Sequence, residues 1–492
     1  MGLADPMRLT WRELLVELGR ADLLVAAPAE GPVPSDLSVD SRSVGPGSVY
    51  LAVRGSQVDG HRFVTDAIRR GAGAVVVEAP SGSAVPEIVV RDGRRAALVL
   101  GAAWFGHPAR RLSLVGVTGT NGKTTTTGII RHLLNAGGSS GSIGTLGAFD
   151  GRGEPVASTA GTLTTPGPID LQATLAVLVE RGVDRVTMEA SSHSLDQGRL
   201  DGLAFAAGVF TNLTRDHLDY HSTMESYLAA KLRLGGMLTG SGVEVVNLDD
   251  TAWQALPTRS RRVTFGLHPA ADVRATGIVL DAAGSRFRLG GCFGTAEVSL
   301  PLLGDFNVAN ALAAAACALG IGLRLDEVSA RLSSTPQVPG RMELLSEIPC
   351  VVLRDYAHTP DALERALATL RPLTAGRLVV VFGCGGDRDK GKRPLMGRIA
   401  AQGADLAVVT SDNPRTEDPG AIIDDIEQGM GGAAHLRIPD RLTAIHTALE
   451  QAGAGDTLVL AGKGHETYQV LGTERVPFDE RAIVEKAVKG EK

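Results

Sequence analysis

The chain has 492 residues, of which 43% are hydrophobic and 21% are charged, and its formal net charge at pH 7 is −6. The length allows about three domains, and the acidic balance argues against a nucleic-acid-binding protein, which usually carries a basic stripe. The four cysteines form no Cys-x-x-Cys pair, which is typical of a reducing cytosol rather than of a disulfide framework or a zinc site. There is no signal-peptide pattern and no uncharged run near a membrane span of about 18 residues, so we expect a cytoplasmic protein without membrane insertion.

Residues 1–111 show the short alternating elements of a small α/β domain. A helix is predicted from Trp11 to Leu18, and turn residues separate two short strands within residues 39–53. Residues 63–78 then predict a helix, a glycine turn and a strand. Taken alone, Asp40-Ser41-Arg42 is more typical of a hairpin turn with a solvated arginine than of a binding site.

A phosphate-binding loop is the most informative feature of the chain. The β-branched run at 112–117 predicts a buried strand, TGTNGKTTTT follows at 118–127, and apolar residues at helical spacing continue to a glycine pair at 137–138. Glycines in such a loop let backbone N–H groups approach anionic oxygens, and the helix N-terminus adds positive potential. Lys123 is expected to reach the β/γ-phosphates, and Thr124 to offer its hydroxyl to Mg²⁺.

The match to the standard phosphate-loop pattern is imperfect. That pattern has glycine five residues before Gly122, where this chain has Val117, with Gly116 one place early. A glycine-rich turn that only joins a strand to a helix is the alternative. Because Gly-Lys-Thr-Thr follows directly, we interpret the loop as a site for a nucleoside triphosphate.

Polar residues close several further apolar strands of the central region. Glu189 ends one strand, where the second acidic residue of a nucleotide site would lie, and Asp216 and His217 follow another. In open α/β sheets ligands gather beyond the carboxyl ends of the strands. His217 alone would more often be a hydrogen-bonded loop histidine, and Lys231, on a predicted helix, a solvated lysine. Asn307 and Asn310 are either caps or nucleotide contacts.

A proline- and glycine-rich linker at 336–341 precedes a second series of strand, polar loop and helix. The loops at 355–360, 383–394, 411–419 and 461–466 should share one edge of a doubly wound parallel sheet. Five cations at this edge indicate an anionic ligand, with a solvated charge run over 387–393 as the alternative; they are Arg388, Lys390, Lys392, Arg393 and Arg415.

The motifs together resemble the Mur ligase family, cytoplasmic enzymes that build the peptide stem of bacterial cell-wall precursors. They span essentially the whole chain: DSR, DGHRF, TGTNGKTTT, MEASSH, TNLTRDHLDYH, NALAAA, DYAHTP, GCGGDRDKGKRP, DNPR and GKGHE. The last motifs are similar to those of the MurE branch, and DNPR to its members that use meso-2,6-diaminopimelate rather than L-lysine. The resemblance implies ATP- and Mg²⁺-dependent ligation of meso-diaminopimelate to UDP-N-acetylmuramoyl-L-alanyl-D-glutamate through an acyl phosphate, in peptidoglycan synthesis. It also implies only small-molecule partners, and we expect a monomer.

The fold expected from the resemblance has three α/β domains. These are a small N-terminal UDP-substrate-binding domain at 1–111, a central P-loop ATPase-like domain at 112–339, and a C-terminal Rossmann-like amino-acid-binding domain at 340–492.

The resemblance also assigns roles residue by residue. It implies catalytic roles for Lys123, Glu189, His217 and Lys231, with Lys231 carbamylated and, as the carbamate, a magnesium ligand beside Thr124, Glu189 and His217. ATP would be held by Gly119, Thr120, Asn121, Gly122, Lys123, Thr124, Thr125, Asn307, Arg341 and Asp355. The UDP-substrate would be held by Ser41, Arg42, Ser56, Gln57, Val58, Thr164, Thr165, Ser191, Gln197 and Arg199. Diaminopimelate would be held by Arg388, Asp412, Asn413, Pro414, Arg415, Gly462 and Glu466.

Two kinds of alternative function are considered on the sequence alone. Among enzymes the alternative is a lysine-adding or a folate-polyglutamating ligase, since the phosphate loop by itself would also fit a folylpolyglutamate synthase-like enzyme, but DNPR and GKGHE argue against both. A nucleotide-driven switch that binds ATP without forming a bond is the alternative from another class. The arginine-rich second ligand edge argues against a simple switch.

Overall fold

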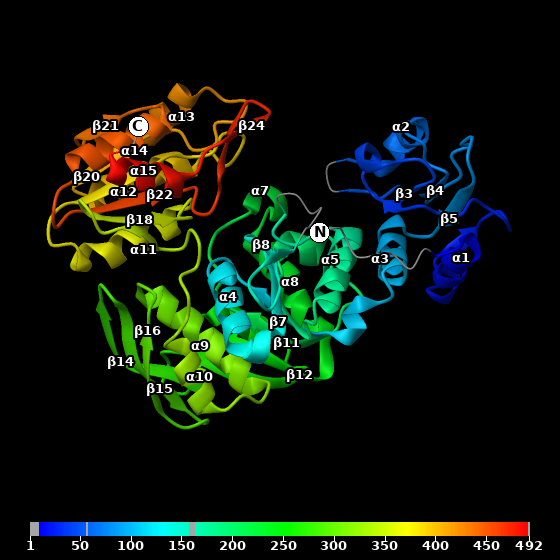
Figure 1. Ribbon diagram of the computed structural model, residues 1–492, viewed down its shortest axis with the longest axis horizontal. Coiled ribbons are helices and arrows are strands. Elements are labelled where there is room, and N and C mark those ends of the chain that lie inside the picture. Colours follow the sequence, from blue (N-terminus) through cyan, green and yellow to red (C-terminus); the bar gives the residue numbers. More distant parts are fainter. Residues whose placement is uncertain (1–8, 56–57, 157–162, 491–492) are drawn as a thin grey trace. The chain divides into compact units, whose positions relative to one another are not determined.

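The computed structural model describes residues 9–55, 58–156 and 163–490 (Figure 1). The chain separates into two compact units. The first comprises the chain up to Arg274 together with 291–293 and 311–328, and the second comprises 275–290, 294–310 and 329 onward. No helix within the described ranges is both long and apolar enough to cross a membrane.

The N-terminal sheet has the order β1-β5-β4-β3-β2, and all its pairs are parallel except β1 with β5. Its elements are α1 (Trp11–Arg20), β1 (Leu24–Ala26), β2 (Leu37–Ser38), β3 (Val49–Leu51), α2 (Val64–Arg69), β4 (Ala74–Val77), β5 (Glu87–Val90) and α3 (Gly93–Trp104). The hairpin turn expected at 40–42 is wrong: Ser41–Ser43 form a short 3₁₀ helix capped by Asp40, and the flanking β2 and β3 pair in parallel. A parallel pair requires a longer crossover than a hairpin turn provides.

The central sheet is built around β6 (Ser113–Thr118), the strand that leads into the phosphate loop. Its order is β16-β15-β14-β13-β12-β11-β6-β10-β7-β8-β9. The other strands are β7 (Ser140–Gly144), β8 (Gly147–Phe149), β9 (Pro155–Val156), β10 (Arg185–Glu189), β11 (Phe205–Phe210), β12 (Leu238–Asn247), β13 (Arg261–Gly266), β14 (Val273–Asp281), β15 (Gly284–Gly291) and β16 (Ala296–Leu300). Because β10 and β11 flank β6 in parallel, their carboxyl ends lie beside the phosphate loop.

The helices of this part of the chain are α4 (Lys123–Leu134), α5 (Pro168–Glu180), α6 (Ser192–Asp196), α7 (Leu218–His221), α8 (Met224–Leu232), α9 (Asp305–Gly320) and α10 (Leu325–Leu332). Apolar side chains of α5, α6 and α8 pack into the central core. Helix α4 ends before the glycine pair at 137–138. The side chain of Asn135, which follows the helix, donates to the Gly151 carbonyl at 2.7 Å and accepts from the Ser140 N–H at 3.0 Å.

The C-terminal sheet has the order β17-β18-β22-β19-β20-β21 and is parallel apart from β17, in agreement with the Rossmann-like prediction. Its strands are β17 (Glu343–Ser346), β18 (Val351–Asp355), β19 (Leu378–Phe382), β20 (Leu406–Val409), β21 (His435–Arg437) and β22 (Thr457–Ala461). One apolar core joins the sheet to α11 (Pro360–Leu370), α12 (Lys392–Gly403) and α13 (Pro419–Glu427). A second core joins it to α14 (Arg441–Gln451) and α15 (Glu480–Lys489), and the hairpin β23 (Tyr468–Leu471) with β24 (Glu474–Pro477) precedes α15.

Candidate active site

The phosphate loop has the backbone shape that its sequence requires. Gly119 has φ +148°, and a Cβ there would lie 1.9 Å from the Thr211 Oγ1, so only glycine fits. Gly122 has φ +84° and immediately precedes α4. The Lys123 Nζ donates to the carbonyls of Gly119 at 3.1 Å and Thr120 at 2.8 Å, so its charge is held against the loop. A cation and a helix N-terminus at one glycine-rich loop form an anion site.

Glu189 and Thr124, two of the predicted metal ligands, are in direct contact. The Thr124 Oγ1 donates to the Glu189 Oε1 at 3.0 Å. Thr145, just after β7, adds two hydrogen bonds to the same carboxylate, from its N–H at 2.8 Å and its Oγ1 at 3.1 Å. Sequence reasoning missed Thr145, although its place directly after a buried strand was a usable signal.

Lys231 is buried, so the expectation that an isolated helix lysine is solvated is wrong. The residue is 1% exposed, and its Nζ donates to the Gly119 carbonyl at 2.7 Å and lies 4.3 Å from the centre of the Tyr227 ring. Burial, and then the positive charge of Lys123, hold the pKa of the Lys231 amine well below its ordinary value, against the attraction of Asp216. The amine is therefore disposed to be neutral, the form that reacts as a nucleophile.

His217 lies in the same electrostatic neighbourhood. Burial lowers the pKa of its imidazole, the carboxylate of Asp216 raises it, and the nearby Lys123 and Lys231 lower it further. The His217 Nε2 is 3.4 Å from the Asp216 Oδ2. In the described part of the chain, no three His, Cys, Asp or Glu residues form a group that could hold a metal ion. Any metal here would need further oxygen donors besides Glu189 and His217.

The five predicted substrate residues of the central domain form one connected cluster beside Glu189. The Thr165 Oγ1 donates to the Glu189 carbonyl at 2.7 Å and to the Ser191 Oγ at 3.3 Å. The Arg199 guanidinium donates to the Thr165 carbonyl at 3.0 Å and, from Nε, to the Gln197 Oε1 at 2.9 Å. The last member, Thr164, accepts from the Thr145 Oγ1 at 3.2 Å.

The UDP-substrate residues predicted in the N-terminal domain do not form such a connected cluster among the described residues. Arg42 is exposed and pairs with Asp40 at 2.7 Å, and Val58 is exposed, while Ser56 and Gln57 lie outside the described residues. Arg94, which sequence reasoning missed, connects this domain to the central one. Its guanidinium donates to the carbonyls of Arg54 and Gln197, each at 2.7 Å. Nothing in the sequence around Arg94 distinguishes it from a solvated helix arginine.

The remaining nucleotide candidates belong to the second unit. Asn307 lies inside α9 and donates to the Leu303 carbonyl at 2.8 Å, and Asn310 donates to the Asn307 Oδ1 at 3.0 Å. The guanidinium carbon of Arg341 lies 4.4 Å from the centre of the Tyr356 ring. Asp355, at the end of β18, accepts from the Met342 N–H at 2.7 Å, and burial raises the pKa of its carboxyl.

The residues predicted to bind the amino-acid substrate meet at the carboxyl edge of the C-terminal sheet. Asn413 donates to the Glu466 Oε2 at 2.9 Å, which joins the DNPR and GKGHE loops. Lys463, whose side chain is fully buried, donates to the Asn413 Oδ1 at 3.1 Å and the Glu466 Oε2 at 3.3 Å. Gly462 has φ +111°, and a Cβ there would lie 2.6 Å from the Asp412 Oδ2. Lys463 was missed as a site residue although it stands inside a recognised motif.

Arg415 and Arg388 both lie against Gly385. A Cβ on that glycine would be 2.9 Å from the Arg415 Nη1 and 3.7 Å from the Arg388 Cγ. Arg415 follows the buried Pro414, has φ +53°, and is held by the β23–β24 hairpin: its N–H donates to the Val470 carbonyl at 3.1 Å. A left-handed conformation is uncommon for a residue other than glycine and clusters at functional sites.

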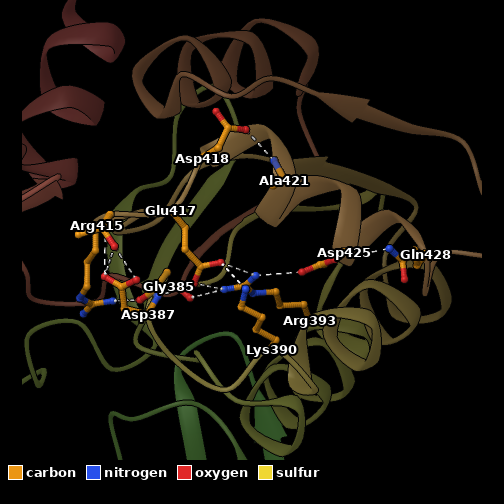
Figure 2. Close-up of polar contacts among 12 residues, drawn as sticks. Gly385, Asp387, Lys390, Arg393, Arg415, Glu417, Asp418, Ala421, Asp425 and Gln428 are labelled. Carbon is orange, nitrogen blue, oxygen red and sulfur yellow. Dashed lines mark hydrogen bonds and ion pairs between the residues drawn. The ribbon is translucent and has the colours of Figure 1, made fainter.

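The prediction that five cations at this edge face a ligand is wrong for Arg393. Arg393 is buried, and its guanidinium donates to Glu417 at 2.9 Å and to Asp425 at 2.9 Å (Figure 2). Lys390 pairs with the same glutamate at 3.2 Å, and Lys392 donates to the His358 carbonyl at 2.8 Å. Sequence spacing could not show this, because the carboxylates come from the next loop and helix of the sheet.

The Glu417 cluster predicts a pH-dependent contribution to stability. Arg393, the Asp387 N–H and Lys390 lower the pKa of Glu417 from 4.5 to about 2. A carboxyl with a depressed pKa in the folded state stabilises the fold above its unfolded pKa, and this contribution is lost as pH falls from 4.5 to about 2. We expect Glu417→Gln to lower the unfolding temperature at pH 7 and to flatten its decline between those pH values. Thermal unfolding across pH measures both effects, and an unchanged slope would contradict the assignment. Glu474→Gln, on the exposed hairpin, is the control.

Comparison with known proteins places this geometry in a family. Family models match residues 35–109 (Mur ligase family, catalytic domain), 117–318 (Mur ligase middle domain) and 340–464 (Mur ligase, glutamate ligase domain). The UDP-N-acetylmuramoyl-L-alanyl-D-glutamate–2,6-diaminopimelate ligase of Geobacillus kaustophilus is 46% identical over 92% of this chain and 94% of its own length. The ligase of the same name from Gloeobacter violaceus is 47% identical over 92% and 93%.

A solved structure agrees over nearly the whole length. The structure of a UDP-N-acetylmuramoyl-L-alanyl-D-glutamate–2,6-diaminopimelate ligase is 35% identical, covers 98% of this chain and 99% of its own, and superposes with a TM-score of 0.65. A phosphate loop, an acidic strand end beside it and a separate arginine-bearing sheet edge thus occur together in a chain that matches these relatives over more than nine-tenths of its length. The protein is an ATP-dependent amide-forming ligase of the Mur ligase family.

Proposed function

We propose that the protein joins meso-2,6-diaminopimelate to UDP-N-acetylmuramoyl-L-alanyl-D-glutamate at the expense of ATP, in cytoplasmic peptidoglycan precursor synthesis. The observation that carries this proposal is the assembled DNPR and GKGHE edge, where Arg388 and Arg415 lie over one glycine and Asn413 contacts Glu466. An acidic amino acid with an extra ammonium group matches such a mixture of charges. The relatives named for this reaction support the same substrate set.

The reaction has two steps. A carboxylate of the bound dipeptide attacks the γ-phosphorus of ATP, giving an acyl phosphate and ADP, and the amine of the amino acid then displaces phosphate to form the amide. Because the first step brings two anions together, a cation must offset their repulsion. Our candidate for that cation is Lys123, whose amine is held against the phosphate loop, and such groups typically contribute a few kcal/mol to transition-state stability. The cluster of Thr165, Ser191 and Arg199 would orient the attacking carboxylate beside it.

The residues around Glu189 fit a magnesium ion. Mg²⁺ prefers hard oxygen ligands, and Thr124 and Glu189 offer a hydroxyl and a carboxylate in contact with each other. We propose that Lys231 supplies a third donor after its neutral amine adds to CO₂, which forms an N–C bond and releases a proton to give an anionic carbamate. His217 completes the set. When bound, the ion would offset phosphate charge during transfer.

The first experiment is an assay of phosphate release with ATP, Mg²⁺ and UDP-N-acetylmuramoyl-L-Ala-D-Glu, with meso-diaminopimelate or L-lysine added in parallel. Turnover with diaminopimelate and not with lysine is the expected result. Turnover with lysine instead would overturn the specificity and keep the chemistry. ATP hydrolysis that ignores every carboxylate and amine would favour the nucleotide switch. Sedimentation of the same sample tests the expectation of a monomer.

A further inference from the structure

A buried ion pair, Arg441 with Glu480, contacts the strand ends that lead into the two loops predicted to bind the amino-acid substrate. Arg441 is the first residue of α14 and Glu480 the first residue of α15, and both side chains are fully buried. The Arg441 Nε donates to the Glu480 Oε1 at 2.8 Å. Its two other nitrogens donate to backbone carbonyls, Nη1 to Ser411 at 3.3 Å and Nη2 to Ala461 at 2.9 Å.

The two carbonyls stand at the start of the two candidate loops. Ser411 follows β20 and directly precedes the DNPR residues 412–415, and Ala461 ends β22 and directly precedes residues 462–466. In the sheet β19 lies between β20 and β22, so no backbone hydrogen-bond ladder joins these two strands. The side chain of Arg441 joins the ends of these two strands, because it donates to the carbonyls of both Ser411 and Ala461. The planar guanidinium has donors for several acceptors at once, which a lysine amine at one point cannot match.

A contribution to the stability of the fold does not by itself explain this ion pair. Replacing a buried ion pair by apolar residues of similar volume is often neutral or stabilising. The Oε2 of Glu480 is buried and has no hydrogen-bond partner within the described residues, so half of this carboxylate is unsatisfied. Buried polar groups without partners are uncommon and call for an explanation. Holding two non-adjacent strand ends in register is a task for which the fork of Arg441 is suited and an apolar pair is not.

We propose that Arg441, oriented by Glu480, is a positioning residue for amino-acid specificity. It sets the distance between the loop that carries Asn413 and Arg415 and the loop that carries Lys463 and Glu466. The inference rests on the proposed role of these loops in binding diaminopimelate. It predicts that damage to the pair raises the KM for the amino acid selectively, because neither Ser411 nor Ala461 adjoins the phosphate loop in sequence or belongs to the cluster beside Glu189.

The test compares Arg441→Lys and Glu480→Gln with a matched control. In Arg441→Lys the single amine can reach one carbonyl but not both, and we expect the KM for diaminopimelate to rise about tenfold or more, as misplacement of binding groups by about 1 Å commonly does. The KM values for ATP and the UDP-dipeptide should change less than about twofold. Glu480→Gln keeps the volume of the side chain and carries the test should Arg441→Lys fail to fold.

The control is Asp456→Asn. Asp456 is buried and pairs with Arg377 at 2.8 Å, and the two residues precede β22 and β19 at the opposite, amino edge of the same sheet. This variant should lower the unfolding temperature without a selective change in the KM for diaminopimelate.

Three outcomes are distinguishable. A selective rise in KM in the Arg441 and Glu480 variants supports the positioning role. Equal losses for all substrates, as in a general loss of stability, would overturn it while the wild-type enzyme still used diaminopimelate. If the wild-type enzyme itself ignored diaminopimelate, the proposed function would fail first, and the inference with it.

Discussion

Replacing Lys231 by alanine should lower the rate of ligation by about 1,000-fold, since it removes the proposed carbamate beside Glu189 and His217. Lys231 is buried against the Gly119 carbonyl, and its amine has a pKa well below the ordinary value. A neutral amine can add to CO₂, whereas an ammonium cannot. The depressed pKa therefore extends the pH range in which the carbamate forms down toward neutrality. Phosphate release under saturating substrates measures the loss.

Chemical rescue gives this prediction its control. Formate or acetate, placed in the space left by the side chain, should restore part of the activity of Lys231→Ala because each supplies carboxylate oxygens. The same anions should not rescue Lys123→Ala, because Lys123 acts as a cation. In the wild-type enzyme, activity should fall in CO₂-depleted buffer and recover with bicarbonate, more completely at higher pH. Full activity of Lys231→Ala without additives would remove this lysine from the mechanism.

The phosphate loop shows how much of the site could be predicted from sequence. Its residues are contiguous, so the sequence predicts a strand, the glycine loop with its lysine, and a helix in that order, and the structure has the same order. The places of Glu189, the last residue of β10, and His217, in the segment after β11, could be expected near the loop because parallel strands bring their carboxyl ends to one edge. The mostly parallel order of the N-terminal and C-terminal sheets follows from the same alternation of strand and helix, whereas the linker expected at 336–341 stays a prediction.

Partners from distant segments could not be predicted in this way. The sequence around Arg393 does not indicate that Glu417 and Asp425 pair with it. The sequence around Lys231 does not indicate that this lysine is buried. Both features depend on how the helices pack. Arg94 and Arg441 are further cases: each donates to carbonyls that lie 20 or more residues away in the chain. Backbone carbonyls carry no sequence signal, so a side chain that binds them is visible only in the fold.

Replacing Arg415 by alanine should raise the KM for meso-diaminopimelate about 100-fold, as expected when one partner of a partly desolvated charge pair is removed. Arg415 uses only Nη1 for its side-chain hydrogen bonds to described residues, to the carbonyls of Gly386 at 2.8 Å and Asn413 at 3.5 Å. Nε and Nη2 remain for a bidentate pair with the side-chain carboxylate of the substrate. Lysine lacks that carboxylate and would leave the guanidinium unpaired, which disfavours lysine as well as favouring diaminopimelate.

Two further variants separate the geometry of Arg415 from its charge. Arg415→Lys keeps the charge and loses the fork, so its KM should lie between those of the wild type and Arg415→Ala. Arg475→Ala removes a neighbouring positive charge, one that stacks on Tyr468 at 4.7 Å, and should change the KM little. Steady-state kinetics with varied diaminopimelate at saturating ATP measures all three. If Arg415→Ala changed the KM by less than about threefold, the bidentate pair would be excluded, and recognition of the substrate carboxylate would have to rest on the neighbouring Arg388.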